Sequence, residues 1–274
     1  MSIDKHSYVL LSFDIEEFDT PNEYGSSLSL PEQISLSEQG TNIILDILQE
    51  SNIKATFFCT TNFATHAQST INRIISEGHE IASHGCSHRT PCNIDITKSK
   101  ELLENLFCVN IYGYRQPRMQ KVDLHKTNYV YNASINPTFI PGRYFNFNSP
   151  RTIFEEDGVI SIPASVTPFF RIPLFWLSLH HMHISLYEFL VKRTLSHDGY
   201  FNTYFHPWEF INLSVPNLKN LPYIIKHNSG EKMIHRLKHF ITFLSKCNVQ
   251  FVTYYQMTTI YKKANEINSS NSML

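Results

Sequence analysis

The sequence predicts an α/β fold in which mostly parallel strands form a closed or nearly closed barrel. Short apolar runs rich in β-forming residues alternate with helical patterns along most of the 274 residues, as in chains built from βα units. The runs number about seven, which suits a (β/α) barrel. No internal repeat or shift in composition marks a second domain, so residues 1–274 are expected to form a single domain.

The individual elements follow from the period of the apolar residues. Strands are predicted over residues 8–15, 55–58, 80–83, 112–115, 200–205 and 250–254. Helices are predicted over residues 41–49, 69–76, 97–106 and 231–244. Residues 136–181 are rich in Pro, Phe and Arg, and are predicted to form long irregular loops. The polar residues 265–274 are expected to be a frayed tail.

Composition excludes several classes of protein. The 23 Lys+Arg and 24 Asp+Glu residues leave a net charge of −1, which gives no long-range attraction to nucleic acid. The 9 glycines are too widely spaced for a dinucleotide-binding motif, a P-loop or a serine-hydrolase elbow. The 5 cysteines are odd in number and never C-x-x-C, which argues against a disulfide framework or a cysteine zinc site.

No apolar stretch reaches the roughly 18 residues of a membrane-spanning helix, and no signal peptide is seen at the N-terminus. We therefore expect a cytoplasmic protein, with peripheral membrane contact left open. One aromatic stretch could lie against a bilayer, although packing in the core is the favoured interpretation. It contains Phe169, Phe170, Leu174, Phe175, Trp176 and Leu177. The histidines that follow it, His180, His181 and His183, are expected in a solvated loop.

Polar residues stand where four of the predicted strands end, which is the edge where functional groups gather in parallel sheets. The first are Asp14 and Glu16, which alternation along the strand places on one face with Ile15 turned away. Two neighbouring carboxylates repel each other unless a cation or a proton lies between them. The pair indicates a cation site, with an acidic loop as the alternative.

The second group contains His84 and His88, whose spacing can present both imidazoles to one metal ion. A chance pair is the alternative, because the chain has 14 histidines. Two histidines and one carboxylate from a neighbouring strand end are typical of catalytic metal sites, which keep positions open for water.

The third and fourth groups contain Arg115 and His206. Arg115 runs into a turn fixed by Pro117, where it can hold a carboxylate and keep it ionised. His206 ends an aromatic strand and is placed to project into a pocket. A surface salt bridge and a structural histidine are the alternatives. The neighbouring Pro117 and Trp208 are candidate substrate-binding residues.

Taken in order, these fragments resemble the motifs of the polysaccharide deacetylase family, also called the NodB-homology family or carbohydrate esterase family 4. The resemblance runs from about residue 8 to residue 208. Residues 84–88 resemble the H-[ST]-x-x-H motif, residues 115–117 the R-x-P motif, and His206 the late histidine motif. The resemblance implies a distorted (β/α) barrel of about seven strands with a divalent metal. Zinc is the expected metal, with cobalt and nickel as alternatives.

On these positions, the resemblance implies that His84 and His88 bind the metal, that Arg115 orients the catalytic base and that His206 is the general acid. In a D-x-[DE] variant of the first motif, Asp14 is the base and Glu16 the third metal ligand, although the two roles could be exchanged.

Three positions depart from the family pattern. Ile15 stands where a second aspartate is usual, and Gly85 replaces a Ser or Thr whose hydroxyl braces the loop. No acidic partner for the late histidine is evident, and Asn132 is the candidate for its place.

The expected function is metal-dependent removal of N-acetyl groups from an amino sugar or glycan precursor in surface polysaccharide metabolism. A precursor linked to a nucleotide or a lipid carrier is the expected partner. Two alternatives remain: a related amidohydrolase acting on a small cyclic amide or formamide, and a non-catalytic glycan-binding relative.

Overall fold

The computed structural model describes residues 7–88, 93–140 and 144–271. Its main feature is one curled nine-stranded sheet, in which all neighbouring strands are parallel except β8 and β9. The strand order is β10 (Tyr200–Phe205), β1 (Ser7–Ile15), β2 (Thr56–Cys59), β3 (Glu80–Ser83), β4 (Gly113–Tyr114), β5 (Tyr131–Asn132), β9 (Val159–Ser161) and β8 (Phe154–Glu156), with β11 (Val249–Phe251) paired to β1. The predicted distorted (β/α) barrel of mostly parallel strands is confirmed.

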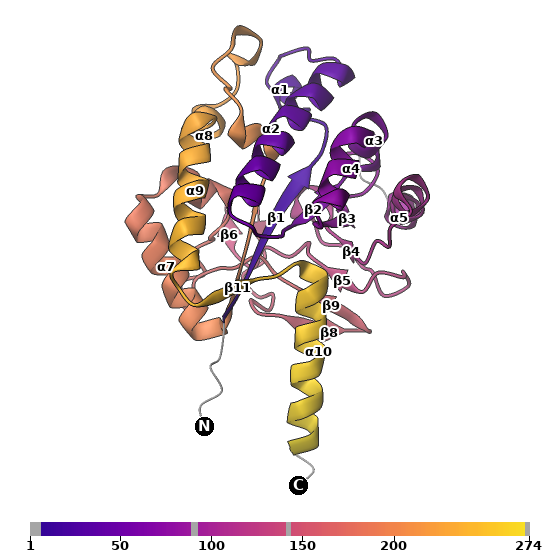
Figure 1. Ribbon diagram of the computed structural model, residues 1–274, viewed down its shortest axis with the longest axis vertical. Coiled ribbons are helices and arrows are strands. Elements are labelled where there is room, and N and C mark those ends of the chain that lie inside the picture. Colours follow the sequence, from indigo (N-terminus) through magenta and orange to yellow (C-terminus); the bar gives the residue numbers. More distant parts are fainter. Residues whose placement is uncertain (1–6, 89–92, 141–143, 272–274) are drawn as a thin grey trace.

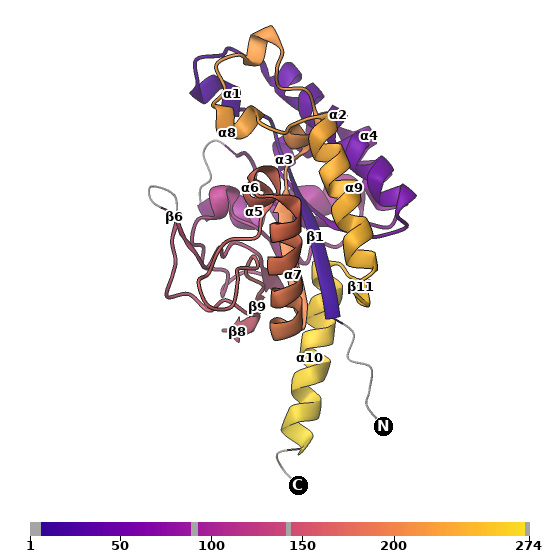
Figure 2. The ribbon, with the colours of Figure 1, turned by 90° about the vertical axis from the view of Figure 1, so that its left-hand side faces the viewer.

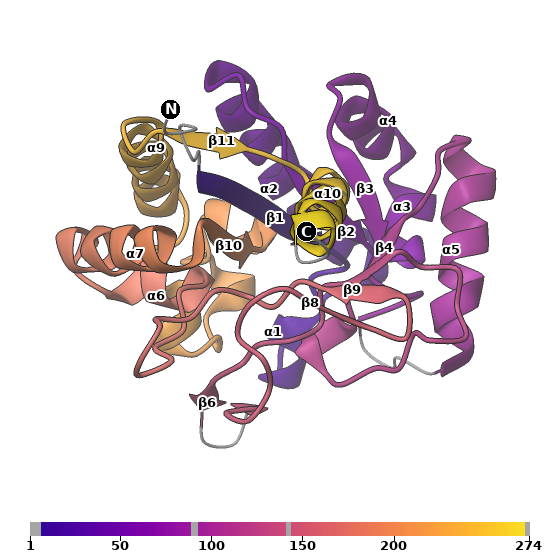
Figure 3. The same ribbon diagram turned by 90° about the horizontal axis from the view of Figure 1, so that it is seen from below.

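Helices lie along most of the outside of this sheet, and loops and short strands lie along the rest (Figure 3). The longer ones are α2 (Leu30–Glu50), α4 (Gln68–Ser76), α5 (Asn93–Phe107), α7 (Ile184–Asp198) and α9 (Glu231–Ser245). A further helix, α10 (Tyr254–Asn271), projects away from one end of the barrel (Figures 1 and 2). No helix among the described residues is both long enough and apolar enough to cross a membrane.

Shorter elements shape the other end of the barrel, where the strands finish. The short helices are α1 (Thr20–Glu23), α3 (Thr61–His66), α6 (Trp176–His181) and α8 (Tyr223–Lys226). The 3-10 turns in the described part of the chain are η1 (Pro117–Met119), η2 (Pro207–Phe210) and η3 (Pro216–Leu218). A separate two-stranded hairpin pairs β6 (Phe139–Ile140) with β7 (Tyr144–Phe145).

Four local predictions differ from the structure. The strand predicted over residues 250–254 ends at Phe251, and Tyr254 already begins helix α10. Helix α2 begins at Leu30 rather than at residue 41, because Glu32 accepts a hydrogen bond from the Ser29 backbone N–H and so closes a capping box. Residues 136–181 contain short strands and helix α6 rather than loops alone. Helix α10 continues through residue 271, where a frayed tail was predicted from residue 265, and residues 272–274 lie outside the described part of the chain.

Alternation along β1 separates two cores. Val9, Leu11 and Phe13 face the large cluster between the sheet and the helices, whereas Leu10 packs inside the barrel. Asp14 lies on the same side of the strand as Leu10, since the two residues are four positions apart. The barrel interior therefore leads directly to the predicted functional carboxylate.

The end of β10 is fixed by close packing against α2. An ideal Cβ on Gly40 of α2 would lie only 2.0 Å from the backbone oxygen of Pro207, the residue that follows His206. Only glycine permits this contact between two backbones. The packing of α2 thus determines where the His206 segment lies.

We predict that Gly40→Ala lowers the free energy of unfolding by about 1–3 kcal/mol, because the added methyl group overpacks a backbone contact. Alanine is intrinsically more favourable than glycine in a helix by about 1 kcal/mol. A net loss of stability would therefore show that the backbone contact outweighs helix propensity. Urea unfolding measures the change. Gln39→Ala, at the exposed neighbouring position, is the control and should be neutral or slightly stabilising. Equal stability of both variants would contradict the prediction.

Candidate active site

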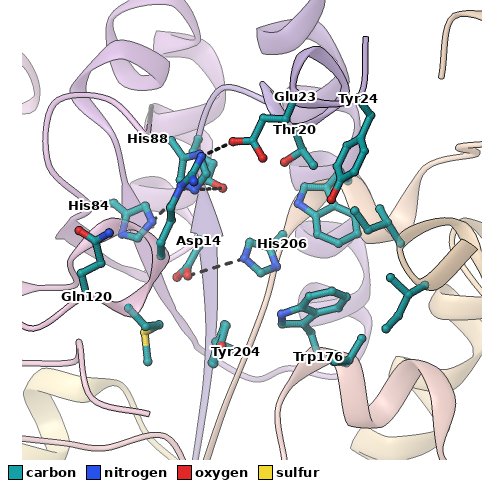
Figure 4. A pocket seen from close by; sticks show the side chains of 17 residues that line it. Asp14, Thr20, Glu23, Tyr24, His84, His88, Gln120, Trp176, Tyr204 and His206 are labelled. Atoms are coloured by element: carbon teal, nitrogen blue, oxygen red, sulfur yellow. Dashed lines mark hydrogen bonds and ion pairs between the residues drawn. The ribbon is translucent and has the colours of Figure 1, made fainter. Parts of the chain in front are cut away.

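A cavity of about 440 Å³ lies at the carboxyl ends of the strands (Figure 4). Its volume is in the range of pockets that hold small ligands, about 300–1,000 Å³. Six of the eight residues predicted from the sequence line it: Asp14, Glu16, His84, His88, His206 and Trp208. Figure 4 shows His84 and His88 beside Asp14 on one side of the cavity, and His206 with Trp176 on the other side.

Arg115 lies beneath this cavity and bonds to Asp14. Its Nη1 donates a hydrogen bond to Asp14 Oδ1, and its Nη2 donates to Ser12 Oγ at 3.0 Å and to the Tyr254 hydroxyl at 2.7 Å. The guanidinium also lies over the Phe58 ring, 3.9 Å from its centroid. Arg115 is therefore a buried, fixed cation rather than a member of a surface salt bridge.

The environment of Asp14 keeps it ionised. Burial on its own would raise the pKa of this carboxyl group, but the positive charge of Arg115, with smaller contributions from His84 and His206, lowers the pKa below its usual value. An ionised carboxylate that faces a cavity is able to accept a proton there.

Glu16, His84 and His88 converge from two loops. His84 Nε2 lies 3.1 Å from Glu16 Oε2, and His88 Nε2 lies 3.6 Å from Glu16 Oε1. Glu16 Oε2 is buried without a hydrogen-bond partner in the described part of the chain. Ligand atoms around a tetrahedral zinc ion are about 3.4 Å apart, given bonds of about 2.1 Å. The two separations are close to this ligand-to-ligand distance, and the unpartnered Glu16 oxygen is available to bind an ion.

The Nδ1 atoms of both histidines make hydrogen bonds that orient the imidazole rings toward Glu16. His84 Nδ1 lies 2.8 Å from the Arg115 backbone carbonyl, which can only accept, so Nδ1 carries the proton and Nε2 presents its lone pair. His88 Nδ1 lies 3.0 Å from Asp19 Oδ1, which likewise places a proton on Nδ1 and leaves Nε2 directed at Glu16. Histidines that ligate metals are commonly held by such carbonyl or carboxylate partners. Among the residues that the structure describes, however, no three acidic, histidine or cysteine side chains already have the spacing of a complete metal site.

Negative charge is in excess on this side of the cavity. Asp14, Glu16, Glu17 and Asp19 are all buried, and buried charges require opposite charges nearby. Burial on its own would lower the pKa of His88, but the negative charges of Glu16 and Asp19 outweigh this effect and raise the pKa to about 9. The site therefore attracts a proton or a cation.

The loop between the two histidines is braced by Glu17. Ser87 Oγ donates to Glu17 Oε1 at 2.6 Å, and the His88 backbone N–H donates to the same oxygen at 3.1 Å. Gly85 has a φ of +77°, a conformation that glycine adopts without strain. The hydroxyl expected at position 85 is thus absent, and a hydroxyl two residues later performs a similar task.

His206 faces Asp14 across the cavity, with 4.0 Å between His206 Nε2 and Asp14 Oδ2. Its Nδ1 lies 3.0 Å from Oε1 of Glu209, a residue that is fully buried. The suggestion that Asn132 partners this histidine is wrong, because Asn132 Oδ1 accepts a hydrogen bond from the Ser134 backbone instead. The sequence H-P-W-E carried a usable signal, since Glu209 reaches back to the His206 N–H as in a helix cap.

The expected solvated histidine loop is also partly wrong. His180 belongs to helix α6 and is fully buried, with Nε2 lying 3.0 Å from Glu209 Oε2. His181 and His183 are exposed, as predicted. The buried apolar residues Leu174, Phe175, Trp176 and Leu179 hold helix α6 against the core. His180 follows them directly, which explains why it is the enclosed histidine of the three.

Aromatic side chains form the wall beside His206. The rings of Trp208 and His206 stack with centroids 5.2 Å apart, and the Trp176 ring packs edge-on against both. Pro117, the other candidate substrate-binding residue, is buried at the start of η1, and the following Arg118 and Met119 line the cavity. Of the aromatic stretch, Leu174, Phe175 and Trp176 are buried, whereas Phe169 and Phe170 are exposed.

We predict that Arg115→Met lowers the free energy of unfolding by about 3–5 kcal/mol, because it leaves a buried carboxylate unpaired. The loss should be smaller when Asp14 is already Asn, since no charge is then left without a partner. Urea unfolding of the four proteins in this cycle measures the coupling. Lys238→Met, which breaks an exposed ion pair with Glu50, should cost less than 1 kcal/mol. Strict additivity of the Asp14 and Arg115 changes would contradict the prediction.

Comparisons with known proteins bear on the family. Residues 4–128, just under half of the chain, match the family model described as polysaccharide deacetylase. An uncharacterized 30.6 kDa protein in the fumA 3' region of Geobacillus stearothermophilus is 34% identical over 64 residues. That match spans only 23% of this chain and 24% of the relative.

Solved structures share the fold over nearly the whole chain. A provisionally assigned polysaccharide deacetylase from Mycobacterium smegmatis has a TM-score of 0.64 at 17% identity, covering 97% of this chain and 93% of that one. PuuE allantoinase has a TM-score of 0.62 at 12% identity, with 94% and 91% covered. A carbohydrate esterase family 4 pseudoenzyme from Bacillus anthracis has a TM-score of 0.52 at 12% identity, with 92% and 66% covered. Together with the match of residues 4–128, this likeness confirms the resemblance of the chain to the polysaccharide deacetylase family.

Proposed function

We propose that this protein is a metal-dependent hydrolase that removes N-acetyl groups from an amino sugar or glycan precursor. The observation that carries the proposal is the convergence of Glu16, His84 and His88 beside an ionised Asp14, with His206 on the opposite side of one cavity. Hydrolysis of an amide needs a base for water and an acid for the departing amine, and the cavity offers one candidate for each.

The proposed metal ligands are Glu16, His84 and His88. A divalent cation bound there, with zinc as the first choice and cobalt or nickel as alternatives, would supply Lewis-acid activation of water and of the acetyl carbonyl. The unpartnered Glu16 oxygen and the orientation of the two imidazoles support this assignment. Glu16 is favoured over Asp14 as the ligand, because Asp14 is already paired with Arg115.

The proton path would use the two sides of the cavity. Asp14, held ionised by Arg115, accepts a proton from the attacking water as the new C–O bond forms. His206 then gives its Nε2 proton to the amide nitrogen, which keeps the electron pair when the C–N bond breaks. Backbone N–H groups after Pro117 are candidates to stabilise the oxyanion.

The substrate is proposed from the shape of the cavity. A volume of about 440 Å³ suits one or a few sugar units better than a long polymer. Trp176 and Trp208 line the cavity and give one wall an apolar character against which part of a sugar can pack. We therefore favour a precursor, linked to a nucleotide or a lipid carrier, over a finished polysaccharide.

Two other functions are weighed against this one. The likeness in fold to PuuE allantoinase and the limited cavity favour a small cyclic amide as the second candidate substrate. The likeness in fold to a pseudoenzyme makes a glycan-binding protein without activity the third candidate. Acetate release from acetylated precursors distinguishes the first candidate from both.

We predict that the purified protein retains about one zinc ion per chain after dialysis against metal-free buffer, and that His84→Ala and Glu16→Gln lose it. Each variant removes one of three ligands, and catalytic zinc sites rarely hold the ion with two. Elemental analysis measures the content, independently of activity. His183→Gln, at an exposed histidine, is the control. Unchanged zinc in both ligand variants would place the metal elsewhere.

We predict that Asp14→Asn lowers kcat for acetate release by about 10²–10⁴, the usual contribution of a general base. Zinc content should stay close to that of the unaltered protein, because Asp14 is not a proposed ligand. Turnover is measured on a panel of N-acetylated nucleotide-linked and lipid-linked sugars. An unaltered kcat in the Asn variant would remove Asp14 from the mechanism.

We predict that part of the protein floats with liposomes, because Phe169 and Phe170 are 73% and 83% exposed and can enter the bilayer interface. The double change Phe169→Ser and Phe170→Ser should abolish flotation. The matched control changes the exposed Leu102 and Leu106 of α5, a helix on the opposite side of the sheet from α7 (Figure 3). Recovery of all protein in the soluble fraction would contradict the lipid-linked version of the substrate.

A further inference from the structure

Behind His206 lies a buried pair of ionisable side chains that the proposed mechanism does not use. Glu209 in η2 and His180 in α6 are both fully buried, and His180 Nε2 lies 3.0 Å from Glu209 Oε2. The Trp176 ring packs edge-on against His180 and also against His206, at 5.6 Å between centroids in each case. The pair is thus shielded from solvent but connected to the cavity through His206.

The positions of the hydrogen atoms around His180 follow from its partners. His180 Nδ1 lies 2.9 Å from the backbone oxygen of His227, and a carbonyl oxygen can only accept, so Nδ1 carries a proton. In a neutral imidazole the other nitrogen then has a lone pair. That lone pair would face the Glu209 carboxylate at 3.0 Å, which is repulsive unless one more proton lies between the two groups.

The second oxygen of Glu209 serves His206. Oε1 accepts from the His206 backbone N–H at 2.6 Å and lies 3.0 Å from His206 Nδ1. His206 Nε2 is thereby left facing the cavity and Asp14. One carboxylate therefore lies between two imidazoles, one on the reaction side and one enclosed in the core.

The other charged and titratable groups around the pair do not replace this proton. Arg236 of α9 approaches α6 but donates to the backbone oxygens of Leu179 and Met182, at 2.7 Å and 2.6 Å. His181 donates to the Ile224 carbonyl and stacks on His227. The remaining neighbours are Tyr187 of α7, whose hydroxyl donates to the Leu174 carbonyl, Tyr204, which packs on His206, and Asp14. Among the described side chains, only His180 and His206 form ion pairs with Glu209.

We propose that His180 and Glu209 share one proton in the folded protein, so that Glu209 presents a largely neutralised carboxylate to His206 and thereby sets the pH range in which His206 can donate its proton. His180 is a positioning residue in this scheme, since it acts on His206 through Glu209. This inference rests on the proposed function only for the role of His206 as the acid. The shared proton itself is a property of the folded chain.

The consequence for the reaction is directional. A bare carboxylate beside Nδ1 would hold the His206 cation tightly and make it a poor acid. A shared proton weakens this attraction, so Nε2 gives up its proton more readily to the departing amine. The proton between His180 and Glu209 stays in place throughout, and the C–N bond breaks with its electron pair on nitrogen.

The test follows His206 by NMR titration of histidine-labelled protein, with equal metal content in each sample. In His180→Gln, which can donate to Glu209 but cannot carry a charge, the His206 midpoint should move up by about one pH unit, because a nearby positive charge is lost. In Glu209→Gln the midpoint should move down. The control His183→Gln changes an exposed histidine of the same segment and should match the unaltered protein. A midpoint in His180→Gln that matches the unaltered protein overturns the proposal.

A second measurement needs no substitution, and so decides the matter if a variant does not fold. The nitrogen and carbon spectra of the unaltered protein at pH 7 should show either His180 with protons on both nitrogens or a protonated Glu209. A neutral His180 beside an ionised Glu209 would overturn the proposal. Neither measurement needs turnover, so a protein that releases no acetate would refute the proposed function and leave this inference standing. In an active protein, the alkaline limb of kcat/KM should move with the His206 midpoint.

Discussion

The buried ion pair between Arg115 and Asp14 joins the barrel core to the cavity, and the arrangement of the site depends on it. Taking both charges out of water costs several kcal/mol for each, and this cost is offset only when the hydrogen bonds of both groups are satisfied. Arg115 satisfies them with Asp14, Ser12 and the Tyr254 hydroxyl, and rests on the Phe58 ring. Strands β1, β2 and β4 and helix α10 must therefore meet in one register for the pair to form.

The same arginine also influences the neighbouring histidine. Its backbone carbonyl accepts the proton of His84 Nδ1, while its side chain pairs with Asp14. One residue thus orients a candidate metal ligand and holds the candidate base ionised. Because both contacts come from one residue at the end of β4, the base and the ligand cannot shift independently of each other.

The sequence was sufficient to predict the fold and the residues contributed by strand ends. Alternation placed Asp14 and Glu16 on one face and turned Ile15 toward the core, and the structure has this arrangement. The pairing of Glu209 with His180 could not be predicted in the same way. The two residues are 29 positions apart and meet only because α6 packs against η2. Short-range patterns report on neighbours within a strand or a helix turn, and such tertiary contacts leave no period in the sequence.

The three departures from the family pattern bear on whether the site is chemically complete. Glu16 stands two residues after Asp14 and lies beside the two histidines, so a candidate ligand is present although Ile15 cannot supply one. Ser87 braces the loop that Gly85 leaves without a hydroxyl, through Glu17.

The remaining departure is resolved on the other side of the cavity. The carboxylate that Asn132 lacks is supplied by Glu209, which reaches His206 from within the same turn. A chain that had lost its chemistry would be free to lose these groups, since each is costly to bury. Here each group that is missing at one position is present at another, next to the side chains that it would serve. This pattern favours a functional hydrolase, in which equivalent groups come from other positions, over an inactive protein that only binds glycan.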